Sequence, residues 1–127
     1  MKEIIQIPGI KEAEYSYSNI VKGGNILYLT SQLSCDLKTG KLIPGSIEEQ
    51  TERSLENIKF ILEHANSSID NILRVRIYMR DINEFARMEK VYKTFFKHGN
   101  EPARVTVQAL SPLHEINIEI EVTAVTN

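Results

Sequence analysis

The chain has 127 residues, of which 42% are hydrophobic and 25% charged, and its formal net charge at neutral pH is −2. This size fits a single domain, residues 1–127, with a sizeable core, and no apolar run approaches the ~20 residues of a membrane-spanning helix. A slightly acidic chain lacks a general attraction for nucleic acid, so such a partner is not expected. The chain has a single cysteine, its three histidines are scattered, and its N-terminus is unlike a signal peptide. These features predict a cytoplasmic protein without a structural metal.

The first 45 residues predict three short strands and a loop. Segments 3–7, 17–21 and 26–30 are rich in β-branched and aromatic residues. The Gly23-Gly24 pair between the second and third segments favours a tight hairpin, because glycine adopts positive φ without strain. Residues 34–45 carry the Asp, Gly and Pro of turns and are expected to form a loop.

Two amphipathic helices are expected. The first begins at Ser46, where Glu49 three residues later makes a capping-box pattern. Its apolar stripe is Thr51, Leu55, Ile58, Leu62 and Ala65. The second begins at Asp81 or Asn83 and ends near residues 97–100. Its stripe, interpreted as core, is Phe85, Met88, Tyr92 and Phe95.

Three further strands alternate apolar and polar residues, at 73–79, 104–108 and 116–124. In the first of them the buried face is expected to be Leu73, Val75, Ile77 and Met79. The element order β-β-β-α-β-α-β-β predicts one α+β domain with both helices on one face of a sheet. The other face would then be half polar and suited to a subunit interface, carrying Arg74, Arg76, Tyr78, Arg104, Thr106, Glu119 and Glu121.

Short motifs occur in a characteristic order along the whole chain. They are Tyr17 before the hairpin, Gly24-Asn25, Thr39-Gly40, Glu49-Gln50-Thr51, Leu55-Glu56-Asn57, Asp81-Ile82-Asn83, Phe85-Ala86, Tyr92, Phe95-Phe96, Pro102-Ala103-Arg104, and Glu119 in an Ile-Glu-Ile-Glu run. Together they resemble the RidA family, also called YjgF/YER057c/UK114.

The resemblance implies a chorismate-mutase-like fold and a homotrimer. Its mixed six-stranded sheet has the last strand beside the third and the Arg104 strand at the far edge. One side of the sheet would carry Tyr17, Thr30, Ser31 and Glu119, and the other Arg104 and Thr106. Clefts between subunits would hydrolyse imines or enamines, such as 2-iminobutanoate or 2-aminoacrylate, to 2-oxo acids and ammonia without a metal or cofactor.

The residue types at these positions suit that chemistry. The planar guanidinium of Arg104 can bind a substrate carboxylate through two parallel hydrogen bonds. Glu119 can orient water or relay its protons, while Tyr17 and Thr30 can bind water, substrate or the leaving amine. A simpler interpretation makes Arg104 and Glu119 an interface salt bridge.

Three further positions, interpreted as substrate-binding, depart from the family pattern. Ser31 stands where glycine is usual, Thr106 where cysteine is common, and Glu89 where the family has an asparagine. Glu89 adds negative charge near the expected cleft. Two other functions remain open: an endoribonuclease or translation inhibitor, which family members have been described as, and a non-catalytic trimer that binds small carboxylates.

Overall fold

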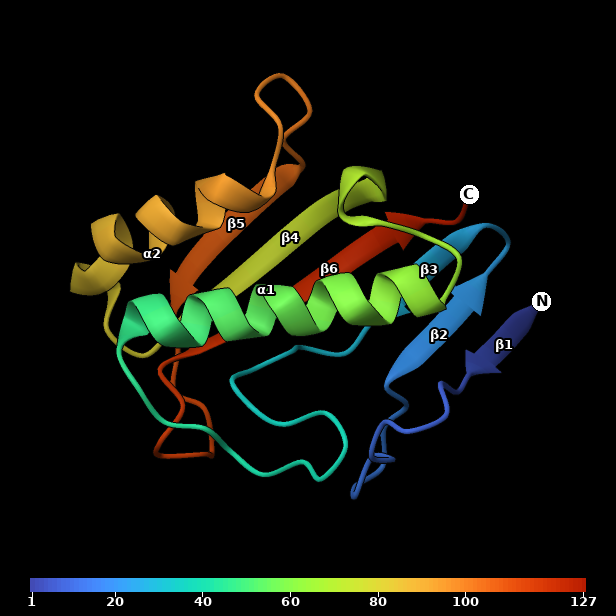
Figure 1. The fold of residues 1–127 in the computed structure, drawn as a ribbon, viewed down its shortest axis with the longest axis horizontal. Coiled ribbons are helices and arrows are strands. Elements are labelled where there is room, and N and C mark those ends of the chain that lie inside the picture. Colours follow the sequence, from blue (N-terminus) through green and yellow to red (C-terminus); the bar gives the residue numbers. More distant parts are fainter.

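A computed structural model describes all 127 residues and shows one six-stranded sheet with both α-helices on the same face (Figure 1). The strands are β1 (Lys2–Ile5), β2 (Ile20–Gly23), β3 (Ile26–Leu29), β4 (Ile72–Met79), β5 (Ala103–Gln108) and β6 (Ile118–Val125). The helices are α1 (Ile47–His64) and α2 (Phe85–Tyr92), with short 3-10 helices at Ile69–Asn71, Ile82–Glu84 and Lys93–Phe95. The α+β class and the element order are therefore as predicted.

The strand order β1-β2-β3-β6-β4-β5 confirms the mixed sheet implied by the family resemblance. Strands β4 and β5 are parallel, and all other neighbours are antiparallel. The last strand, β6, lies between β3 and β4, with its apolar side chains almost completely buried beneath the helices. Since side chains alternate along a strand, the intervening residues of β6 face the open side of the sheet, and these are Glu119, Glu121 and Thr123.

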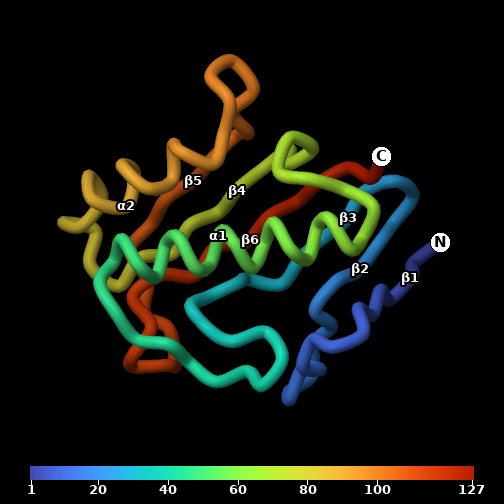
Figure 2. Tube along the Cα trace, viewed as in Figure 1, coloured from blue at the N-terminus to red at the C-terminus, as the bar shows by residue number.

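The hairpin between β2 and β3 forms at the expected place, and Gly24 has φ of 61° in its turn. The strand expected from Tyr17 begins only at Ile20, so Tyr17 lies in the preceding loop. Residues 6–19 lie beside the 30–46 loop, where the Lys11 N–H donates to the Leu37 carbonyl oxygen at 2.8 Å (Figure 2). The Tyr17 N–H donates to the Tyr15 carbonyl oxygen at 2.8 Å, a local contact that takes the place of a sheet hydrogen bond.

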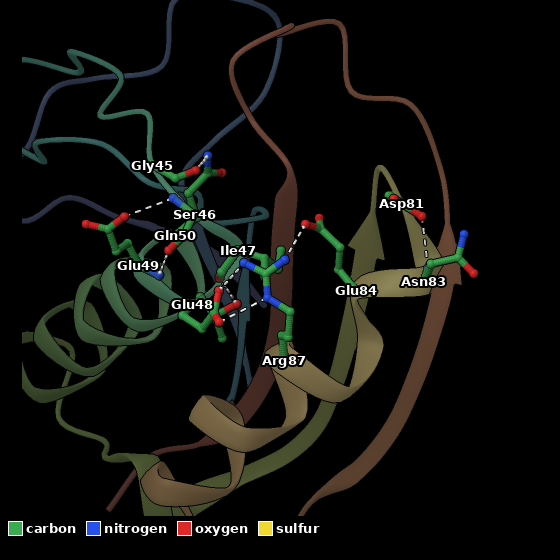
Figure 3. A network of polar contacts seen from close by, with 11 residues as sticks. Gly45, Ser46, Ile47, Glu48, Glu49, Gln50, Asp81, Asn83, Glu84 and Arg87 are labelled. Atoms are coloured by element: carbon green, nitrogen blue, oxygen red, sulfur yellow. Dashed lines mark hydrogen bonds and ion pairs between the residues drawn. The ribbon is translucent and has the colours of Figure 1, made fainter.

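A capping box and an ion-pair cluster organise the start of α1 (Figure 3). Ser46 Oγ accepts from the Glu49 N–H at 3.1 Å, and Glu49 Oε1 accepts from the Ser46 N–H at 2.9 Å. Arg87 of α2 donates to the two carboxylate oxygens of Glu48 at 2.7 and 3.0 Å and to Glu84 at 3.2 Å. Exposed pairs contribute little stability individually, so their main effect is to align α2 with the first turn of α1.

The core lies between the sheet and the helices. The predicted stripes supply much of it, including Leu55, Ile58 and Met88. Leu73 was expected to be buried but is 47% exposed, because the register shifts between Ile72 and Arg74 and interrupts the alternation of β4. Ile72 takes the buried position instead.

The expectation that Arg104 and Thr106 lie on the open face is wrong. In the parallel pair, Arg104 is opposite Val75 and Thr106 is opposite Ile77, and both β4 residues are fully buried beneath the helices. Directly paired residues point to the same face of a sheet. Arg104 and Thr106 therefore lie on the helix side, as the family resemblance implied.

We expect Ser46→Ala to lower the free energy of unfolding by about 1 kcal/mol, because the first turn of α1 loses its side-chain cap. Urea denaturation at one fixed protein concentration measures this change. Ser68→Ala is the matched control, since Ser68 precedes the 3-10 helix Ile69–Asn71 without a side-chain capping bond. Equal losses in the two variants would contradict the capping role of Ser46.

Candidate functional site

A cleft of about 460 Å³ opens on the uncovered face of the sheet, between β4, β6 and the loop 109–117. We call it the Glu119 cleft. Its polar side chains come from three strands or their ends and include Thr30, Ser31, Tyr78, Arg80, Glu119 and Glu121. The structure thus brings three of the predicted site residues, Thr30, Ser31 and Glu119, into one cleft.

The two carboxylates of the cleft have different surroundings. Glu119 Oε1 accepts a hydrogen bond from Ser31 Oγ at 2.7 Å, and its other oxygen has no partner in the chain. Glu121 accepts from the Tyr78 hydroxyl at 2.8 Å, a bond that raises the pKa of Tyr78, and lies 3.5 Å from the Arg76 guanidinium. Glu121 is therefore engaged on both oxygens, while Glu119 has one oxygen free for water.

Long-range contacts bring Ser31 to Glu119 and hold the loop that borders the cleft. Gln32, just after β3, pairs with Ile120 of β6, which brings Ser31 to the edge of β6, and its hydroxyl donates to Glu119. Arg80 donates to three loop carbonyl oxygens at 3.0, 3.2 and 3.3 Å. The buried Gln50 amide of α1 bonds two more backbone groups of the loop, at 3.1 and 2.8 Å.

Tyr17 does not line the Glu119 cleft. Its side chain is 52% exposed and borders a neighbouring hollow of about 380 Å³ between the 10–19 and 30–42 loops. Thr30 and Ser31 line both spaces. The structure therefore places Tyr17 near these two residues but gives it no hydrogen bond to them.

The predicted residue Arg104 lies on the other face of the sheet, against α2. Its guanidinium carbon is 4.6 Å from the ring centre of Tyr92 and 5.5 Å from that of Phe85, and Nη1 is 2.5 Å from Glu89 Oε1. We call these four residues the Arg104 cluster. The aromatic rings and the carboxylate hold a partly exposed guanidinium plane in one orientation.

Two buried hydroxyl groups on this face have no hydrogen-bond partner in the chain, those of Tyr92 and Thr106. Burial raises the pKa of Tyr92 to about 12, so this hydroxyl stays protonated and able to donate. Buried polar groups are nearly always paired in native proteins, and water, a ligand or a neighbouring subunit can each supply a partner for these two hydroxyls.

The sequence pattern predicts Tyr92 only as a core residue, whereas the structure also places its ring beside the Arg104 guanidinium. Phe85, Glu89 and Tyr92 are separated by four and three residues, a spacing that places them on one face of α2. That spacing is the signal that could have linked the predicted Glu89 to an aromatic surface for Arg104.

The two parts of the site are separate within one chain. The sheet lies between the Glu119 cleft and the Arg104 cluster, so Arg104 and Glu119 do not pair with each other. Each has another partner instead, Glu89 for Arg104 and Ser31 for Glu119.

No three His, Cys, Asp or Glu side chains converge in a way that could hold a metal ion. None of the helices combines the length and apolar character that crossing a bilayer would require.

The sheet order, with two helices on one face, defines a class of small α+β proteins, and comparison with known proteins identifies the family. The family model of endoribonuclease L-PSP matches residues 9–126. The chain therefore belongs to this family, which is the RidA family that its motifs resemble.

Relatives and solved structures cover nearly the whole chain. A RutC family protein of Pyrococcus horikoshii is 40% identical over 98% of this chain and 98% of its own length. The rat protein named 2-iminobutanoate/2-iminopropanoate deaminase is 31% identical over 98% of this chain and 90% of its own. The crystal structure of E. coli TdcF with bound serine superposes with a TM-score of 0.85 at 30% identity, covering 98% of this chain and 99% of that one. At the level of the family, these relatives support a deaminase of the hydrolase type.

We expect Thr106→Val to leave the free energy of unfolding unchanged or to raise it by up to about 1 kcal/mol, because the hydroxyl that it removes is buried and unpaired. Thr51→Val is the matched control. Thr51 is also buried, but its hydroxyl donates to the Ile47 carbonyl oxygen at 2.6 Å, so this variant should lose about 1 kcal/mol. Denaturant unfolding of both variants makes the comparison, and a larger loss in Thr106→Val would show that its hydroxyl has a partner.

Proposed function

We propose that this protein hydrolyses 2-imino acids, and enamines such as 2-aminoacrylate that convert to them, into 2-oxo acids and ammonia. The observation that carries the proposal is the Arg104 guanidinium, which lies 4.6 Å from the Tyr92 ring centre and has one N–H group on Glu89 and the others without a hydrogen-bond partner in the chain. Such a cation is suited to a small carboxylate ligand. The names of the deaminase relatives support the same reaction.

The proposed active site is shared between subunits of a homotrimer. Arg104 and Glu119 lie on opposite faces of one sheet, so only a second copy can bring an Arg104 cluster to a Glu119 cleft. The open face also exposes large apolar side chains that a neighbour would cover. These are Ile4, Tyr28, Val105 and Val107.

In this arrangement Arg104 binds the substrate carboxylate and fixes the position of the adjacent C=N carbon. Thr106, Thr30 and Tyr17 supply hydroxyl groups for the substrate or for water. The unpaired Thr106 hydroxyl supports this assignment, because a bound ligand would supply the partner that the chain lacks.

Hydrolysis exchanges the C=N bond for a C=O bond without any change of oxidation state. The imine nitrogen takes up a proton, and a water oxygen then bonds to the carbon and loses a proton, giving a tetrahedral carbinolamine. The C–N bond then breaks as the hydroxyl group loses its proton and becomes the carbonyl, and ammonia leaves. Glu119, with one oxygen on Ser31 and one free, orients the water and relays its protons.

RNA cleavage is the weaker candidate, although the family model carries the name endoribonuclease. A polyanion would have to approach a chain of net charge −2, and recruitment by such a chain is electrostatically poor. The carboxylates of the Glu119 cleft would repel phosphate groups further.

We expect Arg104→Ala to weaken binding of 2-oxobutanoate about a hundredfold or more and to abolish hydrolysis of 2-iminobutanoate generated in situ, because two charge-assisted hydrogen bonds are lost. Calorimetry measures the binding, and 2-oxo acid formation measures the turnover. RNA cleavage is assayed on the same preparations and should be at most a trace that does not respond to the substitution. RNA cleavage that disappears with Arg104, in a wild-type protein without imine hydrolysis, would favour the nuclease.

Glu119→Gln should lower turnover at least about tenfold while substrate binding largely persists, because the amide keeps the size of the side chain but cannot relay a proton. If the site is shared, Arg104→Ala and Glu119→Gln refolded together should recover about a quarter of wild-type turnover, since random mixing unites an intact Arg104 with an intact Glu119 at some interfaces.

Each variant refolded alone is the control, and light scattering should return about three times the 14.5 kDa chain mass. A mixture no more active than the separate variants, or a monomer in solution, would contradict the shared site.

A further inference from the structure

Glu89 makes the Arg104 cluster unusual for a carboxylate-binding site, because the Glu89 carboxylate already forms an ion pair with one N–H group of the guanidinium. The Glu89 and Arg104 side chains are 38% and 24% exposed, and Arg104 Nη1 lies 2.5 Å from Glu89 Oε1. No other hydrogen bond from this guanidinium forms within the chain. A ligand carboxylate can therefore still bind the remaining N–H groups, directly beside Glu89.

The charges decide which ligand fits there. Arg104 and Glu89 together are neutral, so a ligand carrying only a carboxylate leaves two anions beside one partly buried cation. Such like-charge contacts are costly where solvent is partly excluded. A ligand with a cationic nitrogen next to its carboxylate restores neutrality, and Glu89 Oε2, which has no partner in the chain, can accept from that nitrogen.

We infer that Glu89 is a specificity-determining residue that selects zwitterionic ligands, with the carboxylate on Arg104 and the cationic nitrogen facing Glu89. This inference rests on the proposed function, and for an imino acid it names the protonated iminium as the bound form. That form is also the more electrophilic at carbon, so the selected species is the reactive one.

The same carboxylate also disfavours the product. Hydrolysis removes the nitrogen as ammonia. The 2-oxo acid therefore keeps the carboxylate but no longer carries the positive charge that balances the negative charge of Glu89. Product binding should therefore be weaker than substrate binding, even though both ligands contact Arg104.

The test compares 2-aminobutanoate with 2-oxobutanoate by calorimetry, because the two share a carbon skeleton and a carboxylate and differ only at C2, which carries a cationic nitrogen in the first and a carbonyl oxygen in the second. The wild type should prefer 2-aminobutanoate. In Glu89→Gln, affinity for 2-oxobutanoate should rise about tenfold, because the negative charge that repels its carboxylate is removed. Affinity for 2-aminobutanoate should fall about tenfold, because the negative charge that attracts its cationic nitrogen is removed. Inhibition of turnover by 2-oxobutanoate should strengthen in parallel.

Two variants control the comparison. Glu89→Asp keeps the charge and should retain the preference for 2-aminobutanoate. Glu3→Gln makes the same chemical change on β1, at the opposite edge of the sheet from β5, and should alter neither affinity. Light scattering confirms that each variant keeps the wild-type mass.

The outcomes separate this inference from the proposed function. If Glu89→Gln shifts both affinities in the same direction, or shifts neither, Glu89 does not determine specificity and the inference fails. The proposed imine hydrolysis is unaffected by that result. If the wild type binds neither ligand and hydrolyses no imine, the proposed function fails and the inference fails with it.

Discussion

The parallel pairing of β5 with β4 is the constraint on which the rest of the candidate site depends. It sets Arg104 opposite Val75 and Thr106 opposite Ile77, on the side of the sheet that the helices cover. The guanidinium is thereby brought to α2 and its aromatic residues rather than to solvent. A shift of one residue in this register would turn both side chains to the opposite face.

The residues around Arg104 restrict the orientation of its partly exposed guanidinium. An arginine in solvent samples many rotamers, and ordering it costs conformational entropy at the moment of binding. Here Tyr92, Phe85 and Glu89 hold the guanidinium before any ligand arrives. Part of the cost of ordering the binding group is therefore met when the chain folds.

The Glu119 cleft depends on contacts between distant parts of the chain. Ser31 and Glu119 are 88 residues apart in sequence and meet because β6 inserts between β3 and β4. Gln50 and Arg80, from the start of α1 and the end of β4, hold the loop that borders the cleft. The central position of β6 therefore fixes where the proposed proton-relay group lies on the sheet.

The sequence by itself determined the local features: the hairpin turn at Gly24, the capping box at Ser46, and the alternation of β6 that places Glu119 opposite the core. Each is encoded within a few neighbouring residues. The alternation of residues in β5 shows that Arg104 and Thr106 share one face of the strand, but not whether the helices cover that face. Only the tertiary structure shows that Arg104 faces Glu89 of α2. That choice depends on the strand that lies beside β5, and the pairing is made by residues far apart in the chain.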